Sequence, residues 1–333
     1  MIGVDELVAH ARTAFGWTGE VEVTAGARGA LGQVWRVESE SACYALKHIF
    51  DEPPTETSIQ TELDFAARTV GSGVRTPVSH PGRDGRYLVT APGGTWLRCY
   101  DWVDLHPVAL DDPATARRLG VLLARLHRSA PAAWAEPDGG GPPDPWYHRV
   151  PAPSEWADIA AAEAPWSTRL DDRVPMLPAL CAAVGPVDPA RLILCHRDLH
   201  PENIFVDADD VLVVVDWDDL GPAEPGRELA RALFDWWCTE ATTNTEAVYA
   251  MTESYLSEGG PGRITSPVDF TMLLAARLNF LLSQARLATD PKAETSQQEW
   301  AEREVLVGLH LMPASRQLAE VLAVTRECAA AVR

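Results

Sequence analysis

The residues with the clearest chemical character lie between Cys195 and Asp219, in the run CHRDLHPENIFVDADDVLVVVDWDD. Asp198 precedes Asn203 by four intervening residues, and Asp216 ends an apolar run further on. Phosphoryl transfer depends mainly on positioning and charge stabilisation, so it needs an oriented hydroxyl and a metal ion held against phosphates. Asp198 suits the acceptance or orientation of the hydroxyl proton. Mg²⁺ prefers hard oxygen ligands and takes few from the protein, which Asn203 and Asp216 can supply.

Two short apolar runs are expected to position these side chains. Residues 204–206 and 211–215 lie on either side of the acidic segment 207–210. Apolar, β-branched runs around a short polar segment predict a hairpin. This hairpin would return Asp216 to the side of Asn203 and of the loop that carries Asp198.

The runs HRDLHPEN and VVVDWDD together resemble the aminoglycoside phosphotransferase family, small-molecule kinases with the protein-kinase fold. His200 directly after Asp198-Leu199 favours that family over the protein kinases, and Trp217-Asp218 follows Asp216 in place of Phe-Gly. There is also no long activation segment and no A-P-E triplet before the next predicted helix. A chance D-x-x-x-x-N beside an acidic hairpin would explain either half of the pattern but not both.

The resemblance implies an α+β, bilobal, protein-kinase-like fold. Residues 1–103 would form a small β-rich lobe that binds the nucleotide. Residues 104–333 would form a larger, mainly helical lobe with the catalytic loop, the metal site and the acceptor-binding helices. The segment Tyr100, Asp101, Trp102 and Val103 occupies the position of the family's hinge, whose backbone groups hydrogen-bond the nucleotide base.

A glycine-rich turn over residues 25–32 separates two predicted strands, 20–24 and 33–37. Glycine allows backbone amides to approach phosphates closely, so Gly29 and Gly32 are candidate nucleotide contacts. A merely flexible hairpin is the alternative interpretation of this turn.

Lys47 ends the short apolar strand 43–47. A lysine there is commonly a solvent-facing edge residue, but its spacing from the glycine turn matches the family's nucleotide lysine, which contacts the α- and β-phosphates. The resemblance gives it Glu62 as ion-pair partner, on the helix predicted over 55–70. Glu56 is the alternative partner, and a solvated helix charge is the alternative role for Glu62.

Periodicity predicts the remaining helices. A leader helix is expected over 3–15, and Asp112 is a candidate cap for a helix over 113–127. Further helices are predicted over 175–185, 227–237, 244–257, 268–288 and 298–325, with Pro313 kinking or splitting the last. Residues 131–154 hold seven prolines and three glycines and predict a loop insertion. Its aromatic residues and Trp156 would form either part of a substrate wall or anchors for the loop; they are Trp134, Trp146, Tyr147 and His148.

Composition limits the possible partners. The 333 residues carry 28 basic and 48 acidic side chains, a formal charge of −20. This charge disfavours nucleic acid and anionic membrane surfaces as partners and favours a cationic one. Six scattered cysteines without a C-x-x-C pair indicate reduced thiols in a cytoplasmic protein, and no apolar run approaches the length of a membrane span.

The sequence therefore predicts an O-phosphotransferase that uses Mg²⁺ and either ATP or GTP. Its acceptor would be a cationic small molecule, an aminoglycoside or a basic cyclic peptide, that is inactivated by phosphorylation. The carboxylates proposed to line the acceptor pocket are Asp218, Asp219, Glu224 and Asp235, and a shift in geometry is expected at Glu224 and Glu228, where the family usually has Asp. A metabolic hydroxyl kinase for choline, homoserine or a sugar is the alternative enzyme, and a silent kinase-like binding module is the alternative class. The acceptor's identity and the oligomeric state stay open.

Overall fold

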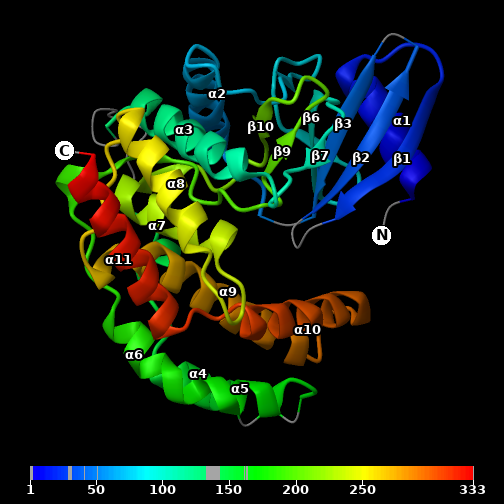
Figure 1. The fold of residues 1–333 in the computed structure, drawn as a ribbon. Helices are drawn as coiled ribbons and strands as arrows, with labels where there is room; N and C mark the ends of the chain where they lie inside the picture. The colour runs from blue at the N-terminus through cyan, green and yellow to red at the C-terminus, as the bar shows by residue number, and fades with distance from the viewer. Residues whose placement is uncertain are drawn as a thin grey trace. The chain divides into compact units, whose positions relative to one another are not determined.

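The structure is a computed structural model that describes residues 3–28, 32–40, 42–50, 52–132, 143–160, 162 and 164–332. Contacts divide the chain into two compact units (Figure 1). The first unit contains residues 1–108 together with 202–218, and the second contains 109–201 and 219–333. The division proposed from sequence, 1–103 and 104–333, made each part continuous. The hairpin after the catalytic loop belongs instead with the N-terminal unit.

An antiparallel sheet forms most of the first unit. Its strands are β1 (Val21–Arg28), β2 (Gly32–Ser39), β3 (Cys43–Ile49), β6 (Thr95–Asp101) and β4 (Ser79–His80), in that spatial order, and β5 (Val89–Ala91) also pairs with β6. Helix α1 (Val4–Phe15) packs on the sheet, and Leu7 and Ala11 join Val37, Leu46 and Leu97 in a buried core. Helix α2 (Glu56–Val70) begins where the Thr55 hydroxyl accepts a hydrogen bond from the Ser58 amide.

The predicted hairpin forms a second, smaller sheet of the same unit. β9 (Ile204–Val206) and β10 (Leu212–Val214) are antiparallel, and β7 (His106–Pro107) pairs with β9. The Arg75 carbonyl accepts a hydrogen bond from the Val214 amide, at an N–O distance of 2.9 Å. Trp217 is buried just beyond β10, where its indole donates to the Thr76 hydroxyl at 2.9 Å and its ring meets Phe65 of α2 edge-on. The hairpin is thereby fixed within the first unit.

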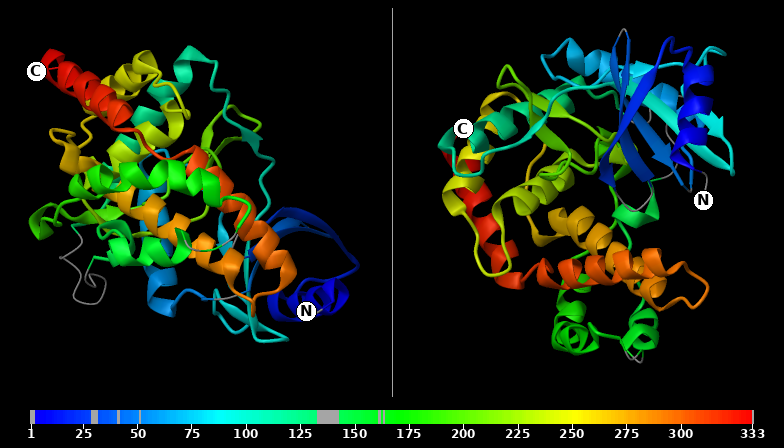
Figure 2. Two further views of the ribbon diagram at one scale, coloured as in Figure 1. Left: turned by 90° about the horizontal axis from the view of Figure 1, so that it is seen from below. Right: turned by 90° about the vertical axis from the view of Figure 1, so that its right-hand side faces the viewer.

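The second unit is mainly helical. Its helices are α3 (Pro113–Ser129), α4 (Pro153–Ala160), α5 (Ser167–Arg173), α6 (Leu177–Ala182), α7 (Pro225–Trp237), α8 (Thr245–Ser257), α9 (Thr271–Thr289), α10 (Thr295–His310) and α11 (Ser315–Ala331). The short strands β8 (Ile193–Cys195) and β11 (Gly221–Ala223) pair on either side of the catalytic-loop region. Helix α10 runs along α9, and α11 packs on α8 (Figure 2).

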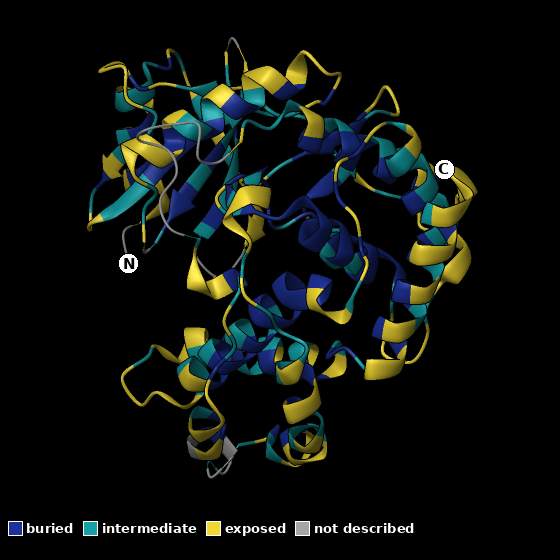
Figure 3. Ribbon diagram, turned by 90° about the vertical axis from the view of Figure 1, so that its left-hand side faces the viewer, coloured by how far each residue is buried: buried dark blue, intermediate teal, exposed yellow. Residues whose placement is uncertain are grey.

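Buried residues of this unit gather on α7 and α9 (Figure 3). Nearly every residue of α7 is buried, including the charged residues Arg227 and Glu228. Helix α3 approaches α8 closely at Gly120, where an added Cβ would lie 2.2 Å from the Met251 carbonyl oxygen. Gly120 is therefore required by packing.

The α+β class predicted from sequence is confirmed. Pro313 separates α10 from α11, and the helix predicted over 175–185 is reduced to α6. Helices α4 and α5 were not predicted. Tyr147 and Trp156 are buried, which favours the anchoring role for these two aromatics, while Trp134 lies outside the described residues. Among the described helices, none is long and apolar enough to cross a membrane.

Candidate active site

In the first unit, the hairpin places Asn203 and Asp216 at its open end. The Val215 amide donates to the Asn203 carbonyl at 3.0 Å, which extends the ladder one step beyond β9 and β10. Asp216 follows with a φ of +57°, a left-handed conformation that is uncommon for residues other than glycine. Trp217, which contacts Thr76 and Phe65, lies between Asp216 and Asp218 and thereby fixes both acidic residues.

Lys47 projects from β3 to these two carboxylates. Its Nζ lies 2.7 Å from Asp216 Oδ1 and 2.6 Å from Asp218 Oδ2. Burial disfavours the charged ammonium, but the two carboxylates outweigh burial and raise the pKa of Lys47 above its ordinary value. Lys47 is therefore a fixed cation directly beside the predicted metal ligand.

The predicted ion pair between Lys47 and Glu62 is not formed. Glu62 instead binds Arg98 of β6 in a bidentate pair, with N–O distances of 2.6 and 3.0 Å. Lys47 and Arg98 are direct neighbours in the register of β3 and β6, so both cations lie on the same face of the sheet. The planar guanidinium matches the Glu62 carboxylate bidentately, and the lysine reaches Asp216 and Asp218. The alternative partner, Glu56, is exposed in the first turn of α2.

The oxygen atoms at the end of the hairpin fit a magnesium ion. Asp216 and Asp218 bring two carboxylates to one cation, the Lys47 ammonium, and Asn203 offers a buried amide oxygen. Hard oxygen donors of this kind are the ligands that Mg²⁺ takes beside nucleotide phosphates. The role of Asn203 and Asp216 as metal ligands stays a prediction, and Asp218 lies beside Asp216 as a further carboxylate.

The glycine turn is partly described. An added Cβ on Gly32 would lie 2.5 Å from the His48 carbonyl oxygen, so only glycine fits at the start of β2. The Gln33 side chain donates to the carbonyls of Gly26 and Ala27 at 2.8 and 3.0 Å, which ties β2 to the end of β1. Gly29 lies outside the described residues, and the phosphate contacts stay a prediction.

The predicted hinge segment follows β6. The Asp101 amide donates to the Val78 carbonyl at 2.9 Å, and the Trp102 amide donates to the Cys43 carbonyl at 3.1 Å. These two amides are occupied by the sheet itself. A nucleotide base would therefore use other backbone groups between Tyr100 and Val103.

In the second unit, Asp198 is held by two side chains, an arginine and a histidine. Arg231 of α7 donates to Asp198 Oδ1, and His200 Nε2 lies 3.3 Å from Asp198 Oδ2. Burial alone would raise the pKa of Asp198, but Arg231 and His200 outweigh burial and hold it well below its ordinary range. Its two partners thus favour the ionised form of Asp198.

A buried hydrogen-bonded chain braces the loop that carries Asp198. Glu228 accepts a hydrogen bond from the Arg197 amide and pairs with His127 Nε2 of α3 at 2.6 Å. His127 Nδ1 lies 2.7 Å from the Tyr255 hydroxyl, which accepts from the Gly262 amide at 2.7 Å. Arg197 itself has a φ of +69°, so the brace supports a residue in an uncommon conformation.

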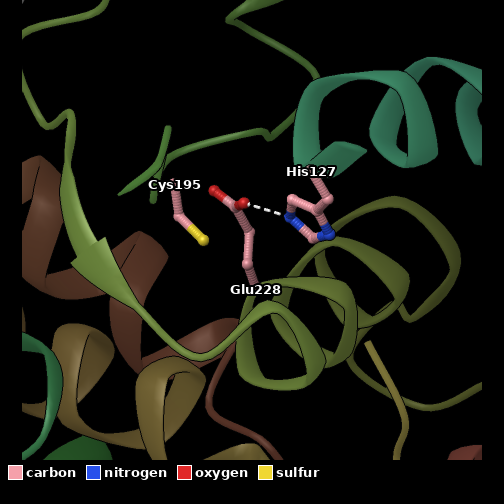
Figure 4. Close-up of side chains that lie close together, drawn as sticks. All are labelled: His127, Cys195 and Glu228. Carbon is pink, nitrogen blue, oxygen red and sulfur yellow. Dashed lines mark hydrogen bonds and ion pairs between the residues drawn. The ribbon is translucent and has the colours of Figure 1, made fainter. Parts of the chain in front are cut away.

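Cys195 lies beside this brace (Figure 4). The ligand atoms of His127, Cys195 and Glu228 all lie within 4.8 Å of one another, a spacing that a metal ion would allow. However, the His127 ring and the Glu228 carboxylate bind each other directly, and Glu228 also accepts from the Arg197 amide. The arrangement is therefore a hydrogen-bonded support for the loop. Glu228 thus supports the loop through a backbone amide, and the shift in geometry relative to an aspartate stays a prediction.

A family model matches the part of the chain that carries these residues. The model of the phosphotransferase enzyme family (APH) matches residues 22–264, which include Lys47, Asp198 and Asp216. The chain belongs to this phosphotransferase family. As a member of the APH family it is an enzyme that transfers phosphoryl groups. A comparison with curated proteins gives no match.

Solved structures show the same fold as this APH member at low sequence identity. A microcompartment-associated aminopropanol kinase is 22% identical with a TM-score of 0.65, over 96% of this chain and 99% of that one. A spectinomycin phosphotransferase in complex with ADP and spectinomycin is 13% identical with a TM-score of 0.63, over 98% and 99%. An amicoumacin kinase in complex with AMP-PNP, Ca²⁺ and Ami is 17% identical with a TM-score of 0.59, over 94% of this chain and 95% of that one.

The carboxylates predicted to line the acceptor pocket of this APH member are largely paired. Glu224 is buried and binds Arg227 at 2.8 Å and Arg191 at 3.0 Å. Asp235 binds Arg277 at 2.5 Å and Arg231 at 3.3 Å. Asp218 binds Lys47 in the first unit.

Asp219 has a different environment. Burial and the negative charge of Asp198 raise the pKa of its carboxyl, and a hydrogen bond with the Tyr147 hydroxyl opposes that shift. Tyr147 also lies under the Arg197 guanidinium, 4.1 Å from the ring centroid. Among the four predicted acceptor carboxylates, Asp219 is the one whose described contacts include no direct ion pair.

Sequence reasoning missed Arg98, Arg231 and His127. Arg98 stands between Leu97 and Cys99 in an otherwise apolar strand, and a charge there signals a buried partner. Arg231 lies four residues before Asp235, the spacing of an i,i+4 pair on a helix. His127 carried no comparable signal, because its partner Glu228 is far away in sequence.

Proposed function

We propose that this APH member transfers the γ-phosphate of ATP or GTP to a hydroxyl group of a small molecule. The observation that carries the proposal is the contact of Lys47 with Asp216 and Asp218. A fixed ammonium beside two carboxylates is suited to bind phosphate oxygens together with their metal ion. The family assignment supports phosphoryl transfer as the reaction class.

Each chemical residue has a role in this reaction. Lys47 binds phosphate oxygens, and Glu62 acts on it through Arg98, which occupies the next position across the sheet. Asn203 and Asp216 would hold Mg²⁺, which would supply neutralisation of the developing phosphate charge. Asp198 accepts a hydrogen bond from the acceptor hydroxyl and orients its oxygen towards the phosphorus atom.

The proposed acceptor is a cationic antibiotic, an aminoglycoside or a basic cyclic peptide, which phosphorylation inactivates. The formal charge of −20 raises the local concentration of cations. The names of two structural neighbours, a spectinomycin phosphotransferase and an amicoumacin kinase, point to antibiotics as acceptors. Six free cysteines suit a reducing compartment such as the cytoplasm.

A metabolic hydroxyl kinase is the second candidate. The pairing of Glu224 and Asp235 with arginines favours it, because paired carboxylates attract a polycation less strongly than free ones. The aminopropanol kinase among the structural neighbours is consistent with a small amino alcohol as acceptor.

A panel of antibiotics and metabolites tests both candidates. Magnesium-dependent release of ADP or GDP would be measured with each compound, and mass spectrometry would then detect a phosphate added to the acceptor. We expect an aminoglycoside or a basic peptide to give the highest kcat/KM. Turnover confined to amino alcohols or sugars would support the metabolic kinase, and nucleotide binding without transfer to any compound would support a binding module.

A further inference from the structure

Arg231 is the most highly connected cation near Asp198. It donates to Asp198 Oδ1, to the Arg197 carbonyl and to Asp235 Oδ2, the last at an N–O distance of 3.3 Å. Its side chain is 14% exposed, so these partners replace most of its contact with water. One guanidinium therefore fixes both the carboxylate and the backbone at the same turn of the catalytic loop.

The helix supplies this contact by its spacing. Glu228, Arg231 and Asp235 follow one another at three- and four-residue intervals on α7, so they lie along one face. Glu228 accepts from the Arg197 amide, and Arg231 donates to the Arg197 carbonyl. Arg197 has a φ of +69°, and its amide and carbonyl are thus both bound by side chains from one face of α7.

A second arginine keeps Arg231 in place. Arg277 of α9 binds Asp235 Oδ1 at 2.5 Å, and Asp235 Oδ2 binds Arg231. Asp235 is 7% exposed and lies between the two guanidinium groups. The order Asp198, Arg231, Asp235, Arg277 alternates in sign, which compensates the burial of each charge.

We propose that Arg231 is a positioning residue that holds Asp198 as an ionised, oriented carboxylate, so that Asp198 aligns the acceptor hydroxyl before it takes up a proton. This inference rests on the proposed phosphoryl transfer. The bond from the acceptor oxygen to the γ-phosphorus forms as the bond from phosphorus to the nucleotide oxygen breaks. The proton leaves the acidic oxygen of the new ester for Asp198 and then for water, and the nucleotide leaves as the diphosphate.

The charges around Asp198 agree with this role. The groups that face it are Arg231 from α7, His196 and His200 from its own loop, and Asp219 from the segment before β11. A carboxylate paired in this way is a weak base in the ground state, so early proton abstraction is unfavourable. Orientation is then its main contribution.

The test compares Arg231→Gln and Arg231→Lys with a matched control, Arg286→Gln, which removes an arginine of α9 outside this network. We expect Arg231→Gln to lower kcat about 10²-fold through misplacement of Asp198, with the nucleotide KM nearly unchanged. Arg231→Lys keeps the charge but not the fork and is expected to recover part of the loss. Arg286→Gln is expected to keep kcat within about threefold of wild type, because Arg286 pairs with Glu155 and no described contact joins it to the network around Asp198.

The second measurement does not depend on turnover. Carbon-13 NMR of the aspartate carboxyls, assigned by comparison with Asp198→Asn, reports the titration of Asp198 in the protein without nucleotide. We expect the pKa of Asp198 to lie well below the ordinary aspartate range in wild type and to be higher by at least about one unit in Arg231→Gln, because the pairing cation is lost. The apparent pKa of the acid limb of the kcat–pH profile should likewise be higher in Arg231→Gln than in wild type.

The outcomes separate the two proposals. An unchanged Asp198 titration in both Arg231 variants, or an unchanged kcat in Arg231→Gln, would overturn the role of Arg231. A raised Asp198 pKa in Arg231→Gln, in a protein that phosphorylates no compound of the panel, would support the pairing of Arg231 with Asp198. It would reject the proposed phosphoryl transfer. If Arg231→Gln fails to fold, Arg231→Lys supplies the same comparison at smaller amplitude.

Discussion

At the scale of single residues, the carboxylate of Asp198 is engaged on both oxygens, with Arg231 on Oδ1 and His200 3.3 Å from Oδ2. Asp198→Asn keeps the shape but removes the charge and the proton acceptor. We expect kcat to fall by roughly 10²- to 10⁴-fold, the range for a positioned acid or base. Nucleotide affinity, measured by calorimetry, should hardly change. An Asp198→Asn enzyme with nearly full turnover, beside an inactive Asp216→Asn enzyme, would show that the roles are assigned wrongly.

The ion pair of Glu62 and Arg98 gives a second residue-scale prediction. Arg98 is fully buried, so Glu62→Gln leaves its guanidinium with the more distant Asp218 carboxylate, at 3.9 Å. We expect a loss of about 3–5 kcal/mol in the free energy of unfolding, measured by urea denaturation. Lys47→Ala should instead abolish most activity with a smaller loss of stability, since water can reach Asp216 and Asp218, which are half-buried to exposed. Equal stability of Glu62→Gln and wild type would contradict the structural role of the pair.

Asp198 and Glu62 show which parts of the site can be predicted from sequence and which cannot. The HRDLHPEN and VVVDWDD runs located Asp198, Asn203 and Asp216, because their spacing within one short stretch is set by local chain geometry. The partner of Glu62 depends instead on the register between β3 and β6, which brings Arg98 beside Lys47 across about fifty residues of sequence. A register between distant strands leaves no signal in residue spacing. The family resemblance therefore predicted Lys47 as the partner of Glu62, whereas the structure shows Arg98.

At the scale of helices, the crossing of α3 and α8 depends on Gly120. Alanine favours a helix over glycine by about 0.5–1 kcal/mol. The added Cβ would meet a backbone carbonyl of α8 at 2.2 Å, and overpacking of this kind costs about 1–3 kcal/mol. We expect Gly120→Ala to be destabilising, as measured by thermal and urea unfolding. A more stable variant would show that the two helices can separate without cost.

The brace between α3, α7 and α8 makes a prediction at the same scale. Tyr255→Phe removes the hydroxyl that meets His127 Nδ1 and the Gly262 amide. We expect kcat to fall about tenfold with unchanged nucleotide KM, because Glu228 is less well fixed against the Arg197 amide. Thr252→Val is the matched control, since Thr252 is also buried on α8 and donates to the Val248 carbonyl within its own helix. An equal loss of kcat in both variants would mean that the effect is only a general softening of α8.

Periodicity predicted most of the long helices because their apolar faces are regular over several turns. It missed α4 and α5, which are seven or eight residues long and follow a proline-rich segment. Their stability comes from packing, as with Trp156 and Trp166, both of which are buried. Packing of this kind is not visible in the local pattern.

For the whole molecule, the charge of −20 predicts how acceptor use depends on salt. Exposed charges are screened beyond about 8 Å at physiological ionic strength. We expect kcat/KM for a cationic acceptor to fall steeply between low and high salt, and that for the nucleotide to change less. The measurement is a salt titration of the coupled assay with a neutral acceptor as control. Efficient use of the neutral compound, with no salt dependence for the cationic one, would exclude charge as the basis of acceptor choice.

The discontinuity of the first unit has a consequence for synthesis on the ribosome. Its sheet is complete in sequence by residue 108, but residues 202–218 belong to the same unit and carry Asp216 and Asp218, the partners of Lys47. At about 5–20 residues per second, the intervening 110 or so residues take roughly 5–20 s to be translated. During that interval Lys47 and Arg98 are adjacent on one sheet face, with Glu62 as the only carboxylate of this cluster yet made. The nascent N-terminal unit should therefore remain susceptible to proteases until residue 218 has left the exit tunnel, and a fragment ending at residue 108 should not reach the protection of the full chain.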